Sequence, residues 1–415
     1  MTTHRTDRMT SPRTVTAEDK SFPAELHDHE ISELDAPLAA FSTPLLVLDG
    51  PSMAHNLRVM DEWASSRGLE LMPHGKTTMA PVLWHRQLRA GATGITVATG
   101  WQADVALRAG ISTVQIANMC LDPALLRRLS AWIAEHPEQE LVCWADSVGA
   151  VELMEGAMPA HARLGVLVEL GAEGGRTGAR TEAEALAIAE KIAASPVLSL
   201  RGVGGYEGAL GHDRSDAALK AVRTYCVRLA ALGETIRDRT EGPAWITAGG
   251  SAYPDLVAAE ISGIPGTRAI LRSGAYIVHD SVFYRGISPL DRDRGLEEAE
   301  ALLPSMRAHA RVISQPEPGL ALLDAGKRDV PFDEGLPVPL AVSEHLGGPE
   351  RPLRAEVTAL NDQHAFLRWE GEAPVVIGDV VTLGLSHPCT AFDKWRLIPV
   401  VGADGRVTEA VETVF

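Results

Sequence analysis

The stretch LELMPHGKTT, residues 69–78, begins with a short apolar run and ends in a glycine loop that carries Lys76. Short apolar or β-branched runs bounded by Gly and Pro predict buried strands. Seven more such runs follow, separated by segments with helical periodicity, and this alternation indicates βα units in a parallel sheet. Together the eight runs predict a (β/α)₈ barrel. The seven runs are residues 94–99, 113–118, 140–146, 164–170, 200–208, 245–250 and 269–278.

A ninth run, residues 43–49, precedes these eight. Because a barrel accommodates eight strands and residues 69–76 lead into the lysine loop, we assign residues 69–76 to the first barrel strand. After about residue 290 short strands follow one another across Gly, Pro, Asn and Asp turns without helices, which predicts an antiparallel β domain. The expected organisation is a flexible tail (1–20), a barrel (51–289) and a discontinuous β domain (21–50 and 290–415).

The balance of acidic and basic residues restricts the kinds of partner that the protein is expected to bind. The 415 residues include 38 Lys and Arg against 55 Asp and Glu, a formal charge of -17. This balance opposes nucleic-acid binding, which needs a basic surface. No apolar run is long enough to span a bilayer, and residues 1–20 lack the apolar core of a secretory signal. We therefore expect a cytoplasmic protein that binds neither nucleic acid nor membranes.

The four cysteines are few and widely spaced, which does not indicate a disulfide framework. Three of them, Cys120, Cys143 and Cys226, lie in apolar segments and are expected to be buried. The fourth is Cys389.

Lys76 lies at the carboxyl end of the first predicted barrel strand, the face on which barrel enzymes build their sites. A lysine in this position forms a Schiff base if a desolvated or cationic setting removes its proton. The alternative is an ordinary surface lysine.

Two glycine loops follow the last two barrel strands. Gly249, Gly250 and Ser251 come after the seventh strand, and Gly274 and Tyr276 lie at the eighth. Glycines let backbone N–H groups approach phosphate oxygens, and barrels commonly bind phosphate at these two loops. We predict a phosphate site here, with plain tight turns as the alternative.

Other polar residues fall on the same predicted rim. Arg176 follows the fifth strand and would donate to a pyridine nitrogen or phenolate oxygen, or else remain solvated. Tyr206 and His212, in GGYEGALGH, are candidates for acid–base groups or cofactor contacts, or for structural hydrogen bonds.

The β domain contains SHPCT, residues 386–390. On an extended segment residues i and i+2 face the same way, so His387 and Cys389 would offer an imidazole nitrogen and a thiolate to one cation. This pair favours Zn²⁺ over Mg²⁺ or Ca²⁺. Two protein ligands leave positions for substrate and water, although a third ligand from a distant loop, or no metal at all, fits the same sequence.

From about residue 42 to its end, the sequence resembles the D-threonine aldolase and D-serine dehydratase family, pyridoxal-5'-phosphate (PLP) enzymes with a barrel of the alanine racemase type. The matching stretches are PHGKTTMAP (73–81), VELGAEGGRTG (168–178), TAGGS (247–251), LRSGAYIVHD (271–280), LLDAGKRDVPFDEG (322–335) and SHPCTAFDKW (386–395). The loop before Arg176 is about two residues longer than the usual family form, and the segment before Phe41 has no counterpart in the family.

The resemblance implies that Lys76 carries PLP and that Arg176 contacts its pyridine ring. It also implies that the segments of Gly249 to Ser251 and of Tyr276 hold the phosphate, and that His387 and Cys389 bind Zn²⁺ or another divalent metal. Aldolases of the family usually have Asp as the second metal ligand, whereas dehydratases tend to carry His-x-Cys.

The expected reaction is therefore elimination of water from a β-hydroxy D-amino acid such as D-serine or D-threonine, which gives an α-keto acid and ammonia. Cleavage to glycine and an aldehyde, amino-acid racemisation and PLP binding without turnover are the alternatives. A head-to-tail homodimer, with the barrel mouth against the partner's β domain, is also implied by the resemblance.

Overall fold

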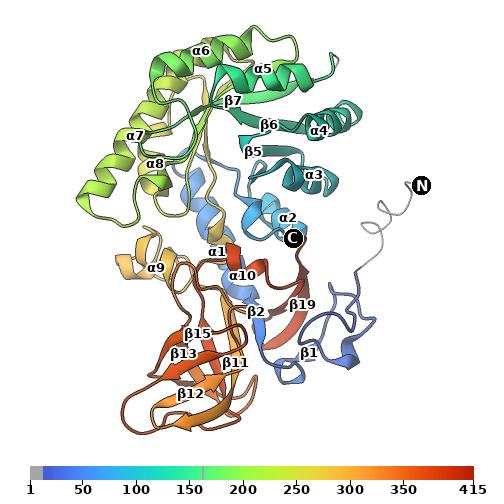
Figure 1. Ribbon diagram of the computed structural model, residues 1–415, viewed down its shortest axis with the longest axis vertical. Helices are drawn as coiled ribbons and strands as arrows, with labels where there is room; N and C mark the ends of the chain where they lie inside the picture. The colour runs from blue at the N-terminus through green and yellow to red at the C-terminus, as the bar shows by residue number, and fades with distance from the viewer. Residues whose placement is uncertain (1–12, 161–162) are drawn as a thin grey trace.

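A computed structural model describes residues 13–160 and 163–415. The chain forms two sheets, an eight-stranded parallel sheet surrounded by helices and an eleven-stranded sheet below it in Figure 1. Within the described ranges, no helix is both long and apolar enough to cross a membrane.

The parallel sheet closes into a barrel. Its strands follow the order β3-β10-β9-β8-β7-β6-β5-β4. The two ends meet at a parallel bridge between His74 and Thr96, where the Thr96 N–H donates to the Pro73 carbonyl at 2.9 Å. The predicted barrel, with its first strand in residues 69–76, is confirmed. The strands are β3 (Glu70–Leu71), β4 (Ile95–Val97), β5 (Thr113–Met119), β6 (Glu140–Ala145), β7 (Leu164–Leu170), β8 (Leu198–Gly205), β9 (Ala244–Ala248) and β10 (Thr267–Leu271).

Helices cover the outside of the barrel, and short polar side chains cap the first turns of all of those given below except α2 and α8. The Asp122 carboxylate accepts the N–H groups of Ala124 and Leu125, which begins a helix with Pro at its first position. The helices are α1 (Gly50–Ser65), α2 (Pro81–Arg89), α3 (Gly100–Arg108), α4 (Pro123–Glu135), α5 (Val148–Ala157), α6 (Glu182–Ala193), α7 (Asp216–Ile236) and α8 (Pro254–Ile261).

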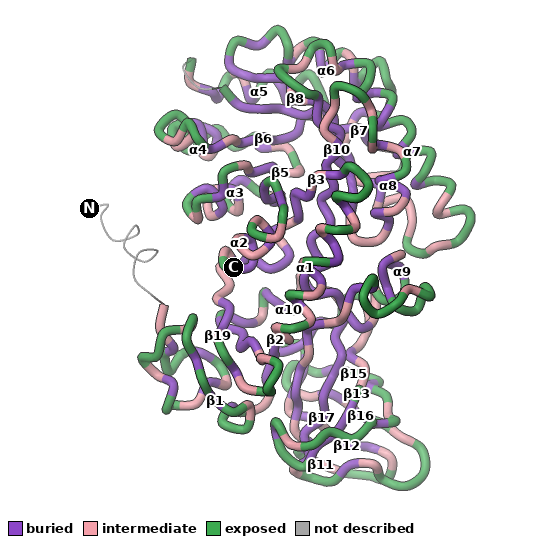
Figure 2. The backbone as a smooth tube through the Cα atoms, turned by 180° about the vertical axis from the view of Figure 1, so that it is seen from behind, coloured by how far each residue is buried: buried purple, intermediate pink, exposed green. Residues whose placement is uncertain are grey.

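Successive residues of a barrel strand lie alternately in two buried clusters. On β6, Leu141 and Cys143 pack with the helices, while Val142 and Trp144 belong to a separate buried cluster with Trp245. Because successive strand residues point to opposite faces, this second cluster fills the barrel interior. Figure 2 shows the buried strands enclosed by helices whose outer sides are exposed. The predicted burial of the three cysteines in apolar segments is also confirmed.

The second sheet is mainly antiparallel, as predicted. The run at residues 43–49 joins this sheet, because β2 pairs antiparallel with β11 and parallel with β18. The exact limits that we assigned to the domains stay predictions. The strands are β1 (Ala36–Pro37), β2 (Leu45–Asp49), β11 (Met306–Glu317), β12 (Leu320–Leu323), β13 (Val338–Ser343), β14 (Arg351–Pro352), β15 (Glu356–Leu360), β16 (Ala365–Arg368), β17 (Val380–Gly384), β18 (Leu397–Val401) and β19 (Arg406–Glu412), with the short helices α9 (Phe283–Ile287) and α10 (Cys389–Phe392).

Part of the segment expected to be a flexible tail contacts the β domain. Val15 is fully buried in an apolar cluster with Phe22 and Leu26, and the Arg13 guanidinium donates to Glu412 at 3.0 Å. These contacts pack residues 13–20 on the β domain, and the flexibility assigned to the tail stays a prediction. The rest of the predicted tail, residues 1–12, lies outside the described residues.

Candidate active site

A cavity of about 330 Å³ lies where the carboxyl ends of the barrel strands meet the β domain. Its walls come from both domains, and it brings together most of the predicted site residues. These are Lys76, Arg176, Tyr206, Gly250, Ser251 and Gly274 from the barrel and His387 and Cys389 from the β domain.

Lys76 is positioned by a tight turn directly after β3. A side chain at Gly75 would have its Cβ 2.7 Å from the Trp84 indole nitrogen, and that indole N–H donates to the Gly75 carbonyl at 3.1 Å. His74, which precedes this turn, has a pKa well below its ordinary value because of burial and then the charges of Lys76 and two arginines. Lys76 therefore projects into a cationic cavity beside a neutral imidazole.

Arg176 and Tyr206 form one wall of the cavity. The Arg176 guanidinium lies 4.4 Å from the centroid of the Tyr206 ring. Burial, and then the charge of Glu207, raises the pKa of the Tyr206 hydroxyl. Tyr206 is therefore a neutral phenol at physiological pH, able to donate a proton or a hydrogen bond.

Part of the backbone predicted to bind phosphate is already hydrogen-bonded within the protein. The N–H groups of Gly249 and Gly250 donate to the carboxylate of the fully buried Glu207, at 2.9 and 2.8 Å. These two donors are therefore already used by the protein. Ser251 and Gly274 do line the cavity, and a Cβ at Gly274 would lie 2.5 Å from the His74 carbonyl oxygen. Close approach of two chain segments thus requires glycine at position 274.

Three predicted residues, Gly249, Tyr276 and His212, do not line this cavity. Tyr276 is buried and does not line this cavity, so its predicted contact with phosphate stays a prediction. His212 lines an adjoining cavity of about 420 Å³, which also touches Arg176 and His387.

Sequence reasoning missed Arg272, which is fully buried at the end of β10. Its guanidinium donates to the Thr247 hydroxyl at 2.8 Å and lies 4.8 Å from the Trp144 ring centroid. Burial lowers the pKa of Arg272 to about 10, so it remains a cation at neutral pH. An arginine inside the otherwise apolar run AILR, residues 269–272, was the available signal.

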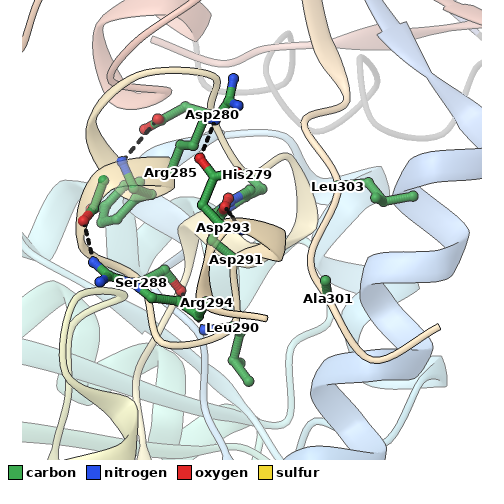
Figure 3. Close-up of polar contacts among 12 residues, drawn as sticks. His279, Asp280, Arg285, Ser288, Leu290, Asp291, Asp293, Arg294, Ala301 and Leu303 are labelled. Atoms are coloured by element: carbon green, nitrogen blue, oxygen red, sulfur yellow. Dashed lines mark hydrogen bonds and ion pairs between the residues drawn. The ribbon is translucent and has the colours of Figure 1, made fainter. Parts of the chain in front are cut away.

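Tyr284, also missed, lines the cavity from α9. The Asp280 carboxylate accepts the N–H groups of Val282 and Tyr284, each at 2.9 Å, and so caps this short helix. Behind it, His279 and Asp291 form a buried contact of 2.8 Å, seen in Figure 3. These contacts fix the segment that carries the Tyr284 side chain.

His387 and Cys389 both line the cavity, although they do not lie on an extended segment. Pro388 has helical angles, φ -57 and ψ -34, and α10 begins at Cys389, so the reasoning from strand geometry was wrong. His387 Nδ1 lies 2.6 Å from Asp333 Oδ2, and Cys389 Sγ lies 3.5 Å from Thr77 Oγ1, next to Lys76.

The charges of this pair follow from its contacts. The hydrogen bond with Cys389 is the main cause that raises the pKa of His387 to about 9. Burial raises the pKa of Cys389, but the hydrogen bonds and charges of His387, Thr77 and Lys76 together lower it below its ordinary value. The raised pKa of His387 and the lowered pKa of Cys389 both favour an imidazolium next to a thiolate.

Both predicted cofactors fit the residues present. His74 Nδ1, Trp144 Nε1, Glu169 Oε2 and Arg272 Nε line or border the cavity and are buried without a hydrogen-bond partner. Buried polar atoms are normally paired, so a polar ligand would account for them. A phosphorylated pyridine matches this set because Lys76, Arg176 and Arg272 supply three positive charges.

A metal would be bound by His387 and Cys389. Asp333 would then orient the imidazole, as carboxylates commonly do at zinc sites. No group of three or more His, Cys, Asp and Glu side chains suited to a metal occurs among residues 13–160 and 163–415.

Comparison with known proteins agrees with this geometry. The model for the alanine racemase N-terminal domain matches residues 48–253, and the model for a putative serine dehydratase domain matches residues 305–401. The lysine-bearing barrel and its β domain therefore define a PLP-dependent enzyme of the alanine racemase fold.

Similar proteins indicate which family of this class the chain belongs to. The chain is 30% identical over 380 residues to a D-threonine aldolase from an Arthrobacter species, covering 91% of this chain and 93% of that protein. It is 27% identical over 399 residues to a D-threo-3-hydroxyaspartate dehydratase from a Delftia species, covering 89% and 97%. The crystal structure of a D-threonine aldolase from Filomicrobium marinum superposes with a TM-score of 0.77 at 24% identity, over 92% of this chain and 97% of that one. The chain belongs to the D-threonine aldolase family of PLP-dependent lyases, as predicted.

Proposed function

We propose that the protein is a PLP- and metal-dependent dehydratase that converts a β-hydroxy D-amino acid into an α-keto acid and ammonia. The observation that carries this proposal is the His387 and Cys389 pair beside Lys76. One solved structure of a D-threo-3-hydroxyaspartate dehydratase is a cysteine-to-alanine variant described as a metal-free form, so a metal is associated with that relative.

In this reaction the residues that line the cavity would have separate roles. Lys76 would hold PLP, with Arg176 and Tyr206 beside the ring and with Ser251 and Gly274 near the phosphate. When bound, PLP withdraws electrons from Cα and so stabilises the negative charge that develops there. The Lys76 amine, once free, removes the α-proton.

His387 and Cys389 would hold Zn²⁺ or another divalent metal. When bound, the metal acts as a Lewis acid on the β-hydroxyl. Tyr206, a neutral phenol fixed under Arg176, is placed to donate a proton as the hydroxyl leaves. Asp333 keeps the imidazole oriented.

Cleavage to glycine and an aldehyde is the second candidate. Its support is the 30% identity to the Arthrobacter D-threonine aldolase. This reaction needs a base for the β-hydroxyl proton, and His212 would serve.

A homodimer is also part of the proposal. Trp101, Leu121 and Val148 follow β4, β5 and β6 and lie on one side of the barrel mouth, and Trp101 is 46% exposed. Exposed apolar side chains grouped near a site favour a protein partner, here a second copy. A cytoplasmic location and the absence of nucleic-acid and membrane binding stay predictions.

The test is to incubate the PLP-loaded protein with D-serine and D-threonine, with and without a chelator. Keto acid and ammonia formed only when metal is present would support the dehydratase. Glycine and aldehyde would instead support the aldolase, and no turnover of either substrate would count against both.

A further inference from the structure

We infer that Arg180 is a positioning residue, which fixes the loop that bears Arg176 and so directs the Arg176 guanidinium into the cavity. The inference rests on the proposed function, in which Arg176 lies beside the ring of PLP. Arg180 itself does not line the cavity. Its effect would therefore reach the cofactor through the backbone of residues 175–178.

The loop between β7 and α6 carries Arg176 on backbone that belongs to neither a helix nor a strand. Half of residues 171–178 are glycines, which lose more conformational freedom on ordering than any other residue. These glycines are Gly171, Gly174, Gly175 and Gly178. Two backbone hydrogen bonds close the base of the loop, from the Gly171 N–H to the Ala179 carbonyl at 2.9 Å and from the Ala179 N–H to the Glu169 carbonyl at 2.8 Å. The part above this base depends on other contacts.

The guanidinium of Arg180 supplies these contacts. Its Nη1 donates to the carbonyls of Thr177 and Gly178, at 2.9 and 2.8 Å. Its Nη2 donates to the carbonyl of Gly175 at 3.4 Å and to the carbonyl of Arg176. A guanidinium presents its N–H groups in one rigid plane, so a single side chain binds four successive carbonyl oxygens of the loop.

The backbone of Arg180 is fixed by the two helices that flank the loop. The Glu184 carboxylate, which also caps the first turn of α6, accepts the Arg180 N–H at 2.9 Å. Arg228 of α7 donates to the Arg180 carbonyl at 3.0 Å. The side chain of Arg180 therefore extends from an anchored backbone over a glycine-rich loop.

Arg176 is the residue whose direction depends on this arrangement. Its carbonyl is bound by Arg180, and the next hydroxyl, that of Thr177, donates to the buried carboxylate of Glu169 at 2.7 Å. With its backbone held in this way, the Arg176 guanidinium lies 4.4 Å from the centroid of the Tyr206 ring and lines the cavity. A lysine at position 180 would keep the positive charge, but its single nitrogen lacks the planar fork that reaches four carbonyls.

The experiment measures the affinity of the PLP-free full chain for PLP, by titration followed by absorbance. We expect Arg180→Gln and Arg180→Lys each to weaken PLP binding about tenfold, because a charged contact with the ring would be lost. Arg239→Gln is the matched control, since this exposed arginine pairs with Glu190 of the same helix α6 at 3.4 Å. Its affinity for PLP should equal that of the unmodified chain.

A double variant tests whether Arg180 acts through Arg176. We expect Arg176→Gln to weaken PLP binding at least as much as Arg180→Gln does. Adding Arg180→Gln to Arg176→Gln should then change the affinity by less than about twofold. A merely structural role for Arg180 would instead weaken binding by the same factor in both backgrounds.

The pH dependence of the absorbance of bound PLP gives a second readout, which a loss of general stability would not change. A cation beside the ring favours the deprotonated form of the bound cofactor. Arg176→Gln and Arg180→Gln should therefore both move the midpoint of this titration to higher pH, and the double variant should move it no further.

The results separate this inference from the proposed function. If the unmodified chain binds no PLP, the proposed function fails. If it binds PLP but Arg180→Lys binds as tightly, or if the loss is the same with and without Arg176, the function stands and the role assigned to Arg180 is wrong. Should Arg180→Gln fail to fold, Arg180→Lys alone and combined with Arg176→Gln decides between these outcomes.

Discussion

Replacement of Asp333 by Asn tests how the metal site is held. Asp333 Oδ2 lies 2.6 Å from His387 Nδ1, and its other oxygen accepts the Thr390 hydroxyl at 2.7 Å. An Asn side chain would keep the size of Asp and the contact with Thr390. It would remove the negative charge that fixes the imidazole and makes it more basic.

The expected loss of metal affinity in Asp333→Asn follows from this geometry. Loss of a carboxylate that orients a metal-binding histidine typically weakens metal affinity by about 10- to 100-fold. The Asp333 side chain is 40% exposed, so solvent replaces part of its effect, and we expect the lower end of the range. A tenfold loss corresponds to about 1.4 kcal/mol.

The assay is competition for Zn²⁺ between the PLP-loaded protein and a chelating dye. Asp393→Asn is the matched control, because this carboxylate lies near the same helix but pairs with Lys394 at the surface. Excess metal should restore turnover in Asp333→Asn. Unchanged affinity, or an equal loss in the control, would refute the role assigned to Asp333.

Three other predictions concern stability. Burial lowers the pKa of His309 to about 4 from an ordinary 6.5, so the unfolded chain binds a proton that the folded chain does not. Stability should therefore fall by about 3 kcal/mol as pH drops through this window, and urea unfolding of His309→Gln should show a flatter pH profile. Lys20 is the cation that pairs with the buried Asp329 and lies 4.0 Å over the Trp395 ring, so Lys20→Met should lower the free energy of unfolding by about 2 kcal/mol; no change in the urea midpoint would contradict this. Tyr276→Phe should cost about 1 kcal/mol of stability but leave PLP affinity unchanged, because this buried side chain does not line the cavity of Lys76; a large loss of PLP in spectroscopic titration would support its predicted contact with phosphate.

The barrel was predictable because buried parallel strands are short apolar runs with a clear period. Counting also placed residues 43–49 outside the barrel, since eight runs were already assigned. The packing of residues 13–20 was not predictable in this way. It depends on Val15 entering a cluster with residues far along the chain and on the ion pair of Arg13 with Glu412.

The site was only partly predictable. Spacing identified His387 and Cys389, although the pair does not lie on a strand: His387 precedes Pro388, and a short helix begins at Cys389. The N–H groups of Gly249 and Gly250 donate to the Glu207 carboxylate, and no local sequence pattern predicts such a contact between two loops. The role of Arg272 likewise depends on its burial beside a neighbouring strand.

The most direct test of the central claim is to reduce the PLP-loaded protein with borohydride, digest it and locate the modified lysine by mass spectrometry. The account predicts a single phosphopyridoxyl group on Lys76, absent from Lys76→Ala. Modification of a different lysine, or none in protein that binds PLP, would contradict it.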